Sequence, residues 1–309
     1  MIMILKITAT RILAKSDFYE LTQYYILKFM SQNPLVRKAS GELQSFSSDK
    51  LRNSLQRAGA EPAIIEEITD NILNRITEGT TTKQIYTRAF RLLRKKRRSM
   101  AARYSLKRAI MELGPSGYPF EQFVGYLFKC MGFKVEVGQT VEGKCVTHEV
   151  DVIASDHKVQ YLVECKYHNS QGKVSNVQVP LYIRSRVNDI IEIREKLPQY
   201  EGFTFQGWVV TNTRFTTDAM NYGLCSGLNL MSWDFPGKNS LKALTERFNA
   251  FPVTTLTQLT KAQKQHLLNN GVVLCKELNQ NPEILDSFHL TKQKIRLVKE
   301  ELSDLCDGQ

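Results

Sequence analysis

The sequence predicts an α/β (α+β) protein in which a small mixed sheet flanked by helices lies between two helical regions. Residues 116–238 alternate between strand and helix patterns in the order α-β-β-β-α-β-α-β. Residues 34–113 and 250–309 instead show mainly the 3.6-residue apolar spacing of amphipathic helices. The chain has 309 residues, of which 42% are hydrophobic, so it is long enough for two or three packed domains.

Within the first helical region, two short strands around Ser40-Gly41 precede four expected helices. The first helix follows Ser47 or Ser48 and ends at Gly59, and the second follows Pro62 and ends near Gly79. Two further helices are expected over residues 82–96 and 98–112. Residues 1–33 form an N-terminal extension. Residues 1–29 are interpreted either as an upstream extension of the reading frame or as a genuine strand and helix.

The charge balance indicates a polyanionic partner. The 42 Lys and Arg residues against 31 Asp and Glu residues give a formal net charge of +11, which favours nucleic acid. No uninterrupted apolar stretch is long enough to span a bilayer, so no membrane partner is expected. The 6 cysteines contain no CxxC pair, which argues against a structural zinc site and fits a reduced, cytoplasmic protein.

Charged residues interrupt two neighbouring apolar strand patterns in the central region. Asp151 lies in the segment HEVDVIA, and Glu164 and Lys166 lie in YLVECKY. Residues two apart on a strand share a face, so Glu164 and Lys166 point the same way, and pairing of the strands would bring Asp151 near them. Two carboxylates and a lysine suit metal-dependent hydrolysis of a phosphodiester bond, whereas surface charges or a structural Glu–Lys pair are the alternative.

Residues 116–238 resemble the Mrr-like branch of the PD-(D/E)xK restriction endonucleases. The resemblance implies that Asp151 and Glu164 bind Mg²⁺ or Mn²⁺, that Lys166 assists the attacking water, and that Glu121 in PFEQF supports the site. It also suggests Gln178 as the glutamine of the following helix, in contact with DNA. In this sequence His148-Glu149-Val150 replaces the family's residues before the metal-binding Asp.

Residues 34–113 resemble the ATP-cone, a nucleotide-sensing domain. The match rests on Val36-Arg37-Lys38, Gly41, Phe46 and Lys50, followed by TTTKQIYTRAF and AARYSLKRA. It implies binding of ATP or dATP as a regulatory ligand by Val36, Lys38, Lys50 and Thr82. Ala39 and Ser40 replace an Arg and an Asp of the family, so a helical scaffold that no longer binds ATP is the alternative.

Ten basic residues and no acidic one lie between Arg88 and Arg108. We expect the densest part to contact DNA phosphates, although the same run could serve the nucleotide or form a solvated face. That part consists of Arg94, Lys95, Lys96, Arg97 and Arg98.

The helical tail, residues 250–309, weakly resembles a helix–hairpin–helix around Asn270-Gly271, with helix packing or dimerisation as the alternative. Taken together, these patterns predict a Mg²⁺-dependent DNA endonuclease regulated by ATP or dATP. Two other hypotheses stay open at this point. One is a nucleotide-responsive DNA-binding regulator with a catalytically silent nuclease fold, and the other is a nuclease specific for junctions or RNA.

Overall fold

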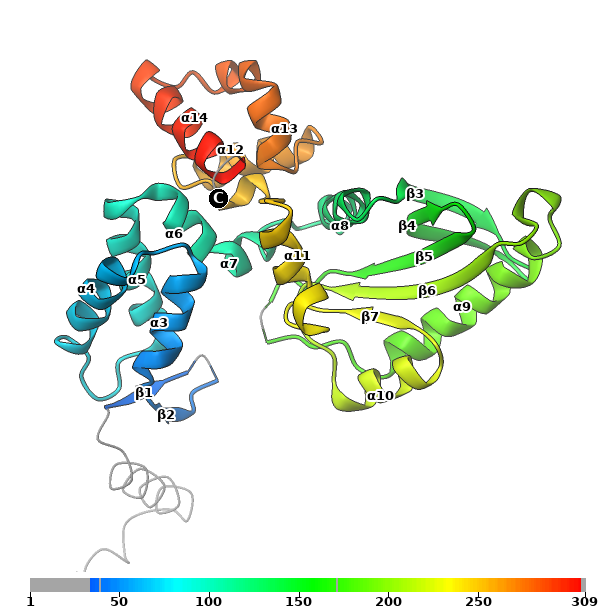
Figure 1. Ribbon diagram of the computed structural model, residues 1–309, viewed down its shortest axis with the longest axis horizontal. Coiled ribbons are helices and arrows are strands. Elements are labelled where there is room, and N and C mark those ends of the chain that lie inside the picture. Colours follow the sequence, from blue (N-terminus) through cyan, green and yellow to red (C-terminus); the bar gives the residue numbers. More distant parts are fainter. Residues whose placement is uncertain (1–33, 39, 171, 307–309) are drawn as a thin grey trace, which may run out of the picture. The chain divides into compact units, whose positions relative to one another are not determined.

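The computed structural model describes residues 34–38, 40–170 and 172–306, which divide into two compact units at Tyr104/Ser105 (Figure 1). The N-terminal extension expected over residues 1–33 lies outside the described residues. No helix in the described part of the chain is long and apolar enough to cross a membrane.

The first unit is a small hairpin followed by helices. Strands β1 (Leu35–Arg37) and β2 (Leu43–Ser45) pair antiparallel. The sequence marks the helix starts well, because Ser47 caps the first helix and Thr81 forms a capping box with Gln84 at the third. The helices are α3 (Ser48–Arg57), α4 (Pro62–Leu73), α5 (Thr82–Lys96) and α6 (Arg98–Tyr104).

Two helix boundaries differ from the sequence expectation. Helix α4 ends at Leu73 rather than near Gly79, because the chain turns back toward the hairpin. The amide of Gly79 donates to the carbonyl of Leu35 at 3.0 Å, which holds the returning segment against β1. The helix expected over residues 98–112 is divided at Ser105 into α6 and α7 (Leu106–Ile110), and the boundary between the two units along the chain falls at this break.

The second unit is built on a five-stranded mixed sheet in the order β3-β4-β5-β6-β7. Strands β3, β4 and β5 are antiparallel neighbours, whereas β5, β6 and β7 run parallel. The connections to the parallel strands are therefore helical crossovers. The strands are β3 (Lys134–Glu142), β4 (Thr147–Asp156), β5 (Val159–Lys166), β6 (Thr204–Thr211) and β7 (Asn229–Met231).

Helices cover both faces of this sheet. Helix α8 (Tyr118–Cys130) packs on β3, β4 and β5, while α9 (Gln178–Arg194) and α10 (Thr217–Cys225) lie on the opposite face (Figure 1). Gly125 lets α8 approach closely, because a Cβ atom there would lie 2.9 Å from Cγ2 of Val137. The observed element order from α8 to β7 is the α-β-β-β-α-β-α-β order predicted from the sequence.

The remaining residues of the second unit are helical and pack as short segments. Gly271, with φ of +76°, forms the turn between α12 and α13, as expected around Asn270-Gly271. The buried carboxylate of Glu301 on α14 accepts two bonds from the amide of Thr257, both 3.0 Å long, and so ties the last helix to a preceding loop. The α-helices are α11 (Leu241–Arg247), α12 (Lys261–Asn269), α13 (Cys275–Gln280) and α14 (Lys292–Cys306), and the 3-10 helices of this unit are η1 (Pro198–Tyr200), η2 (Gly237–Asn239), η3 (Val253–Thr255) and η4 (Pro282–Phe288).

Candidate active site

Strands β4 and β5 separate at the point where they carry their acidic side chains. Their pairing ends at Val152↔Val163, whereas β5 stays paired with β6 as far as Lys166. One residue beyond the last pair, Oδ2 of Asp151 accepts a 2.6 Å hydrogen bond from the amide of Cys165. The Asp151 side chain thus accepts a hydrogen bond from a β5 backbone amide that lies beyond the paired part of β4 and β5.

The backbone of β3 is also irregular opposite Asp151. Gly138 takes a φ of +65°, and the β3–β4 pairing passes from Val137↔Val152 to Gln139↔Val150 without including it. Strict alternation would place Val150 on the opposite face from Ile153, yet both belong to one apolar cluster. The alternation of side chains along β4 is therefore interrupted between Val150 and Ile153, opposite the positive-φ Gly138 of β3.

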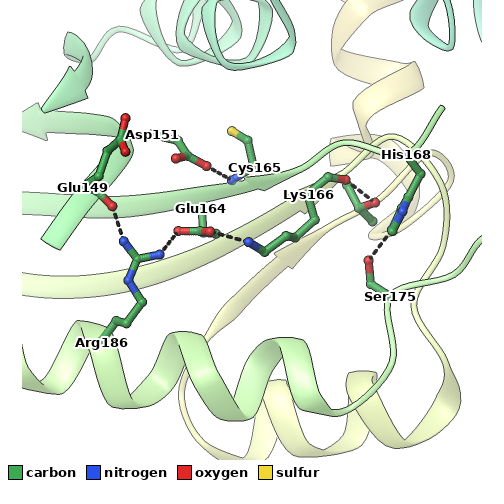
Figure 2. A network of polar contacts seen from close by, with 9 residues as sticks. Glu149, Asp151, Glu164, Cys165, Lys166, His168, Ser175 and Arg186 are labelled. Atoms are coloured by element: carbon green, nitrogen blue, oxygen red, sulfur yellow. Dashed lines mark hydrogen bonds and ion pairs between the residues drawn. The ribbon is translucent and has the colours of Figure 1, made fainter. Parts of the chain in front are cut away.

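Glu164 lies at the centre of the polar contacts and is only 8% exposed (Figure 2). Its Oε1 accepts a 2.5 Å bond from Nζ of Lys166, and its Oε2 accepts a 2.6 Å bond from Nη1 of Arg186 on α9. Arg186 also donates to the backbone carbonyl of Glu149 and lies over the ring of Tyr182, 5.4 Å from its centroid. Two cations from two different elements therefore fix the Glu164 carboxylate.

Burial and mutual repulsion raise the pKa values of two carboxylates at this site. Burial, followed by the charge of Glu164, raises the pKa of Asp151 to about 6. Burial, followed by the charges of Asp151, Glu149 and Glu164, raises the pKa of Glu121 to about 7. Glu121 lies in the first turn of α8, the helix that packs on β3, β4 and β5.

These residues fit a divalent cation of the magnesium type. Their carboxylates repel one another at neutral pH, and a bound cation would remove that repulsion. No group of three or more His, Cys, Asp and Glu residues within the described ranges is close enough to enclose a metal ion. Magnesium commonly binds through one or two carboxylates and keeps water in its other positions, so Asp151 and Glu164 would suffice.

Beyond Lys166, a set of neutral polar groups continues the site. The imidazole Nε2 of His168 lies 3.1 Å from Oγ of the buried Ser175, and the backbone of His168 exchanges two 2.8 Å bonds with the side chain of Asn212 (Figure 2 shows His168 and Ser175). Burial, then the nearby Lys173 and Lys166, lowers the pKa of His168. The imidazole is accordingly held neutral next to the catalytic lysine candidate.

Gln178 does not join this arrangement in the structure. It opens α9 with an exposed side chain, and its Oε1 accepts a 3.4 Å bond from Asn176. The α9 residue that reaches Glu164 is Arg186, which sequence reasoning did not single out. The sequence does not distinguish Arg186 from Arg184 and Arg194, because all three arginines lie on α9. Only the packing of α9 on the sheet shows which of them faces β5.

The first unit contains a pocket where the nucleotide site was expected. Its volume is about 210 Å³, and Val36, Lys50 and Thr82 are among its lining residues. Phe46, Tyr86 and Tyr104 supply aromatic surface to the same pocket. Lys38 is not among the lining residues and pairs instead with Glu42 at 3.0 Å. Three of the four residues named from the sequence therefore share one cavity.

The dense basic run lies around the end of α5. Arg94, Lys95 and Lys96 form its last turn, where cations interact favourably with the helix dipole. Nζ of Lys96 makes a 2.7 Å ion pair with Glu67, so part of the run has an internal partner. Arg97 caps α5 and Arg98 begins α6, and all five side chains are exposed or partly exposed.

Comparison with known families gives the class to which this sheet and site belong. Residues 34–112 match the ATP cone domain, residues 114–234 match the restriction endonuclease family Mrr_cat, and residues 251–306 match the AF1548-like C-terminal domain. These matches confirm the sequence prediction of an ATP-cone followed by an Mrr-like nuclease domain. The chain thus carries a restriction endonuclease domain.

One curated relative identifies the family more closely. A protein of Archaeoglobus fulgidus described as an uncharacterized protein is 31% identical over 168 residues, a match that covers 54% of this chain and 90% of that protein. The chain therefore belongs to the same family as this archaeal protein.

Two solved structures are also similar to this chain. The crystal structure of AF1548, a protein of unknown function, is 30% identical in sequence and has a TM-score of 0.50. The match covers 63% of this chain and 100% of the AF1548 chain. The structure of the MspJI restriction endonuclease in complex with a 27-mer oligonucleotide is 12% identical in sequence and has a TM-score of 0.28. That match covers 68% of this chain and 44% of the MspJI chain. A similarity as low as the latter carries no argument about function.

Proposed function

We propose that this chain is a metal-dependent DNA endonuclease whose activity responds to ATP or dATP. The observation that carries the proposal is the convergence of Asp151, Glu164 and Lys166 where β4 and β5 separate, within a restriction endonuclease domain. A surface charge pair does not explain this geometry, because Glu164 is almost fully buried and bonded to two cations.

In this proposal Asp151 and Glu164 would hold Mg²⁺ or Mn²⁺. Such an ion polarises the phosphate and lowers the pKa of a bound water. Lys166 would orient the attacking water or stabilise negative charge that develops on the phosphate. Glu121, with a pKa near 7, can hold or release a proton at neutral pH beside these groups.

Arg186 acts as a positioning residue for Glu164. It fixes one carboxylate oxygen while Lys166 contacts the other, which limits the rotation of the acidic side chain. The DNA substrate is supported by the net charge of +11. Gln178 and the basic run of Arg94, Lys95, Lys96, Arg97 and Arg98 would contact the DNA, chiefly its phosphates.

Conversion of a supercoiled plasmid to nicked and linear forms tests the nuclease directly. Purified protein is assayed with Mg²⁺, Mn²⁺ or EDTA, beside Asp151→Asn and Lys166→Met. Asp156→Asn is the matched control, because Asp156 lies on the same strand but outside the site. We expect cleavage by wild type and by the control only with metal. Cleavage by Asp151→Asn at the wild-type rate would overturn the assignment of the site.

Nucleotide binding in the first unit is the regulatory part of the proposal. The pocket combines aromatic surface for a nucleoside with Lys50 and the N-terminal end of α5 at Thr82 for phosphates. Isothermal titration with ATP and with dATP tests it, and the plasmid assay repeated with each nucleotide tests the response. Absence of heat with both nucleotides would remove this part and leave the nuclease standing.

A further inference from the structure

A second, strongly basic pocket lies in the first unit on a different side of α5 from the nucleotide pocket. Its volume is about 480 Å³, and it is formed by the end of α4, the segment that follows α4, and α5. We call it the α4–α5 basic pocket. Its four cationic lining residues are Arg75, Lys83, Arg88 and Arg91, and its hydroxyl-bearing ones are Thr77, Thr80 and Thr87.

The positive charges of this pocket lack internal compensation. Neither Asp nor Glu is among its lining residues. Within the described ranges, Arg75, Lys83 and Arg91 form no ion pair, and the half-buried Arg88 donates from Nε to the neutral amide oxygen of Asn71 at 2.9 Å. Burial and the neighbouring Arg75 and Arg91 lower the pKa of Arg88. Cations gathered without carboxylates repel one another, and a bound anion would relieve this repulsion.

The two pockets of this unit differ in the ligand chemistry that they offer. The nucleotide pocket has three aromatic side chains and one cation, Lys50, so it can hold an aromatic base. The α4–α5 basic pocket has four cations and no aromatic residue, so it offers phosphate contacts without a surface on which a base could stack. A phosphate chain therefore fits the second pocket better than a nucleoside does.

The spacing of its groups further favours an extended chain. Lys83, Thr87 and Arg91 lie four residues apart along one stripe of α5, which spans about 12 Å at the rise of an α-helix. Successive phosphates of a duplex strand lie about 3.4 Å apart along the axis, so this stripe can meet about three of them. Arg75 adds a further cation from across the pocket.

We propose that the α4–α5 basic pocket binds consecutive backbone phosphates of a DNA strand. The pocket anchors DNA without reading its base sequence. The identity of the polymer as DNA rests on the proposed nuclease function, whereas the phosphate chemistry rests on the pocket itself.

DNA binding at several salt concentrations tests the proposal. A labelled duplex is titrated with the full chain carrying Asp151→Asn, which prevents cleavage, and with the same chain carrying Arg75→Ala and Arg91→Ala. We expect the slope of the logarithm of the binding constant against the logarithm of the salt concentration to become less negative by about 2 in this variant. The affinity for DNA should fall about 10-fold to 100-fold at low salt. The matched control is a variant that lacks the side chains of Arg57 and Lys129, two exposed cations outside the pocket. We expect this control to show the same salt dependence of DNA binding as the chain with the intact pocket.

Three further readouts separate the outcomes. The affinity for ATP should be unchanged in Arg75→Ala/Arg91→Ala, which shows that the fold and the nucleotide pocket are intact. An unchanged salt slope in this variant would overturn the proposal, even if the protein cleaves plasmid. Loss of inorganic triphosphate binding with unchanged DNA binding would assign the pocket to a free phosphoanion instead. A changed slope in a protein that never cleaves DNA would support the pocket and contradict the nuclease.

Discussion

Replacement of Asp151 by Asn should stabilise the metal-free protein while it abolishes cleavage. In the folded chain, burial and the charge of Glu164 raise the pKa of Asp151 from its ordinary 3.8 to about 6. The folded state therefore resists ionisation of this side chain. Asn is neutral and nearly the same shape, and its amide oxygen can still accept the hydrogen bond from Cys165.

The size of the effect follows from the two pKa values. The difference between 3.8 and about 6 corresponds to about 3 kcal/mol at pH 8, where wild-type Asp151 is ionised in both states. Below pH 3.8 Asp151 is protonated in the folded and the unfolded chain, so its raised pKa has no cost there. As the pH rises through about 6, Asp151 ionises in the folded chain as well, and the folded state loses stability relative to the unfolded state. The stability that Asp151→Asn gains over wild type should thus shrink to roughly half at pH 5 and vanish below pH 3.8.

Urea unfolding in EDTA at pH 5 and pH 8 measures this advantage. Asp156→Asn is the matched control, because it removes a carboxylate of the same strand from an exposed position. Saturating Mg²⁺ should stabilise wild type and leave Asp151→Asn nearly unchanged. If Asp151→Asn is no more stable than wild type at pH 8, or if its advantage does not depend on pH, the reasoning about repulsion at this site is wrong.

Three other substitutions, two of them paired with a matched control substitution, probe the remaining parts of the two sites. Lys166→Met should lower the cleavage rate at least 100-fold without unfolding the chain, as circular dichroism can check, because it removes the cation that in the proposed mechanism stabilises the charge on the phosphate. Arg186→Ala should lower the rate about 10-fold to 100-fold, and Arg184→Ala should have little effect, because Arg186 is the one of these two described arginines that bonds to Glu164. Lys50→Ala should weaken ATP binding about 10-fold in calorimetry, with a smaller loss for Lys38→Ala, because Lys50 lines the pocket and Lys38 pairs with Glu42. Equal effects within either matched pair would contradict these placements.

Much of the fold could be predicted because local signals agree with the packing. Capping residues such as Ser47 and Thr81 mark helix starts, and the alternation of patterns from α8 to β7 gives the order of these elements along the chain. Helix ends were harder to predict. The chain leaves α4 at Leu73 to bond with β1, a contact between residues distant in sequence that no local pattern announces.

For the candidate site, the sequence indicated the residue types but not their arrangement. Glu164 and Lys166 are two apart on one strand, so their contact could be predicted from spacing alone. The position of Asp151 depends on where β4 leaves β5 and on the bend at Gly138, which belong to strand pairing. Arg186 reaches Glu164 only because α9 packs on that face of the sheet, so sequence reasoning passed over it.

The central claim is that the separated ends of β4 and β5 form a metal-dependent hydrolytic site. Its most direct test is the rate of plasmid nicking under single-turnover conditions by wild type and Glu164→Gln, each measured with Mg²⁺ and with EDTA. We predict nicking by wild type that requires Mg²⁺, and loss of at least 100-fold in Glu164→Gln with DNA binding retained. Nicking that persists in EDTA, or at the wild-type rate in Glu164→Gln, would contradict the claim.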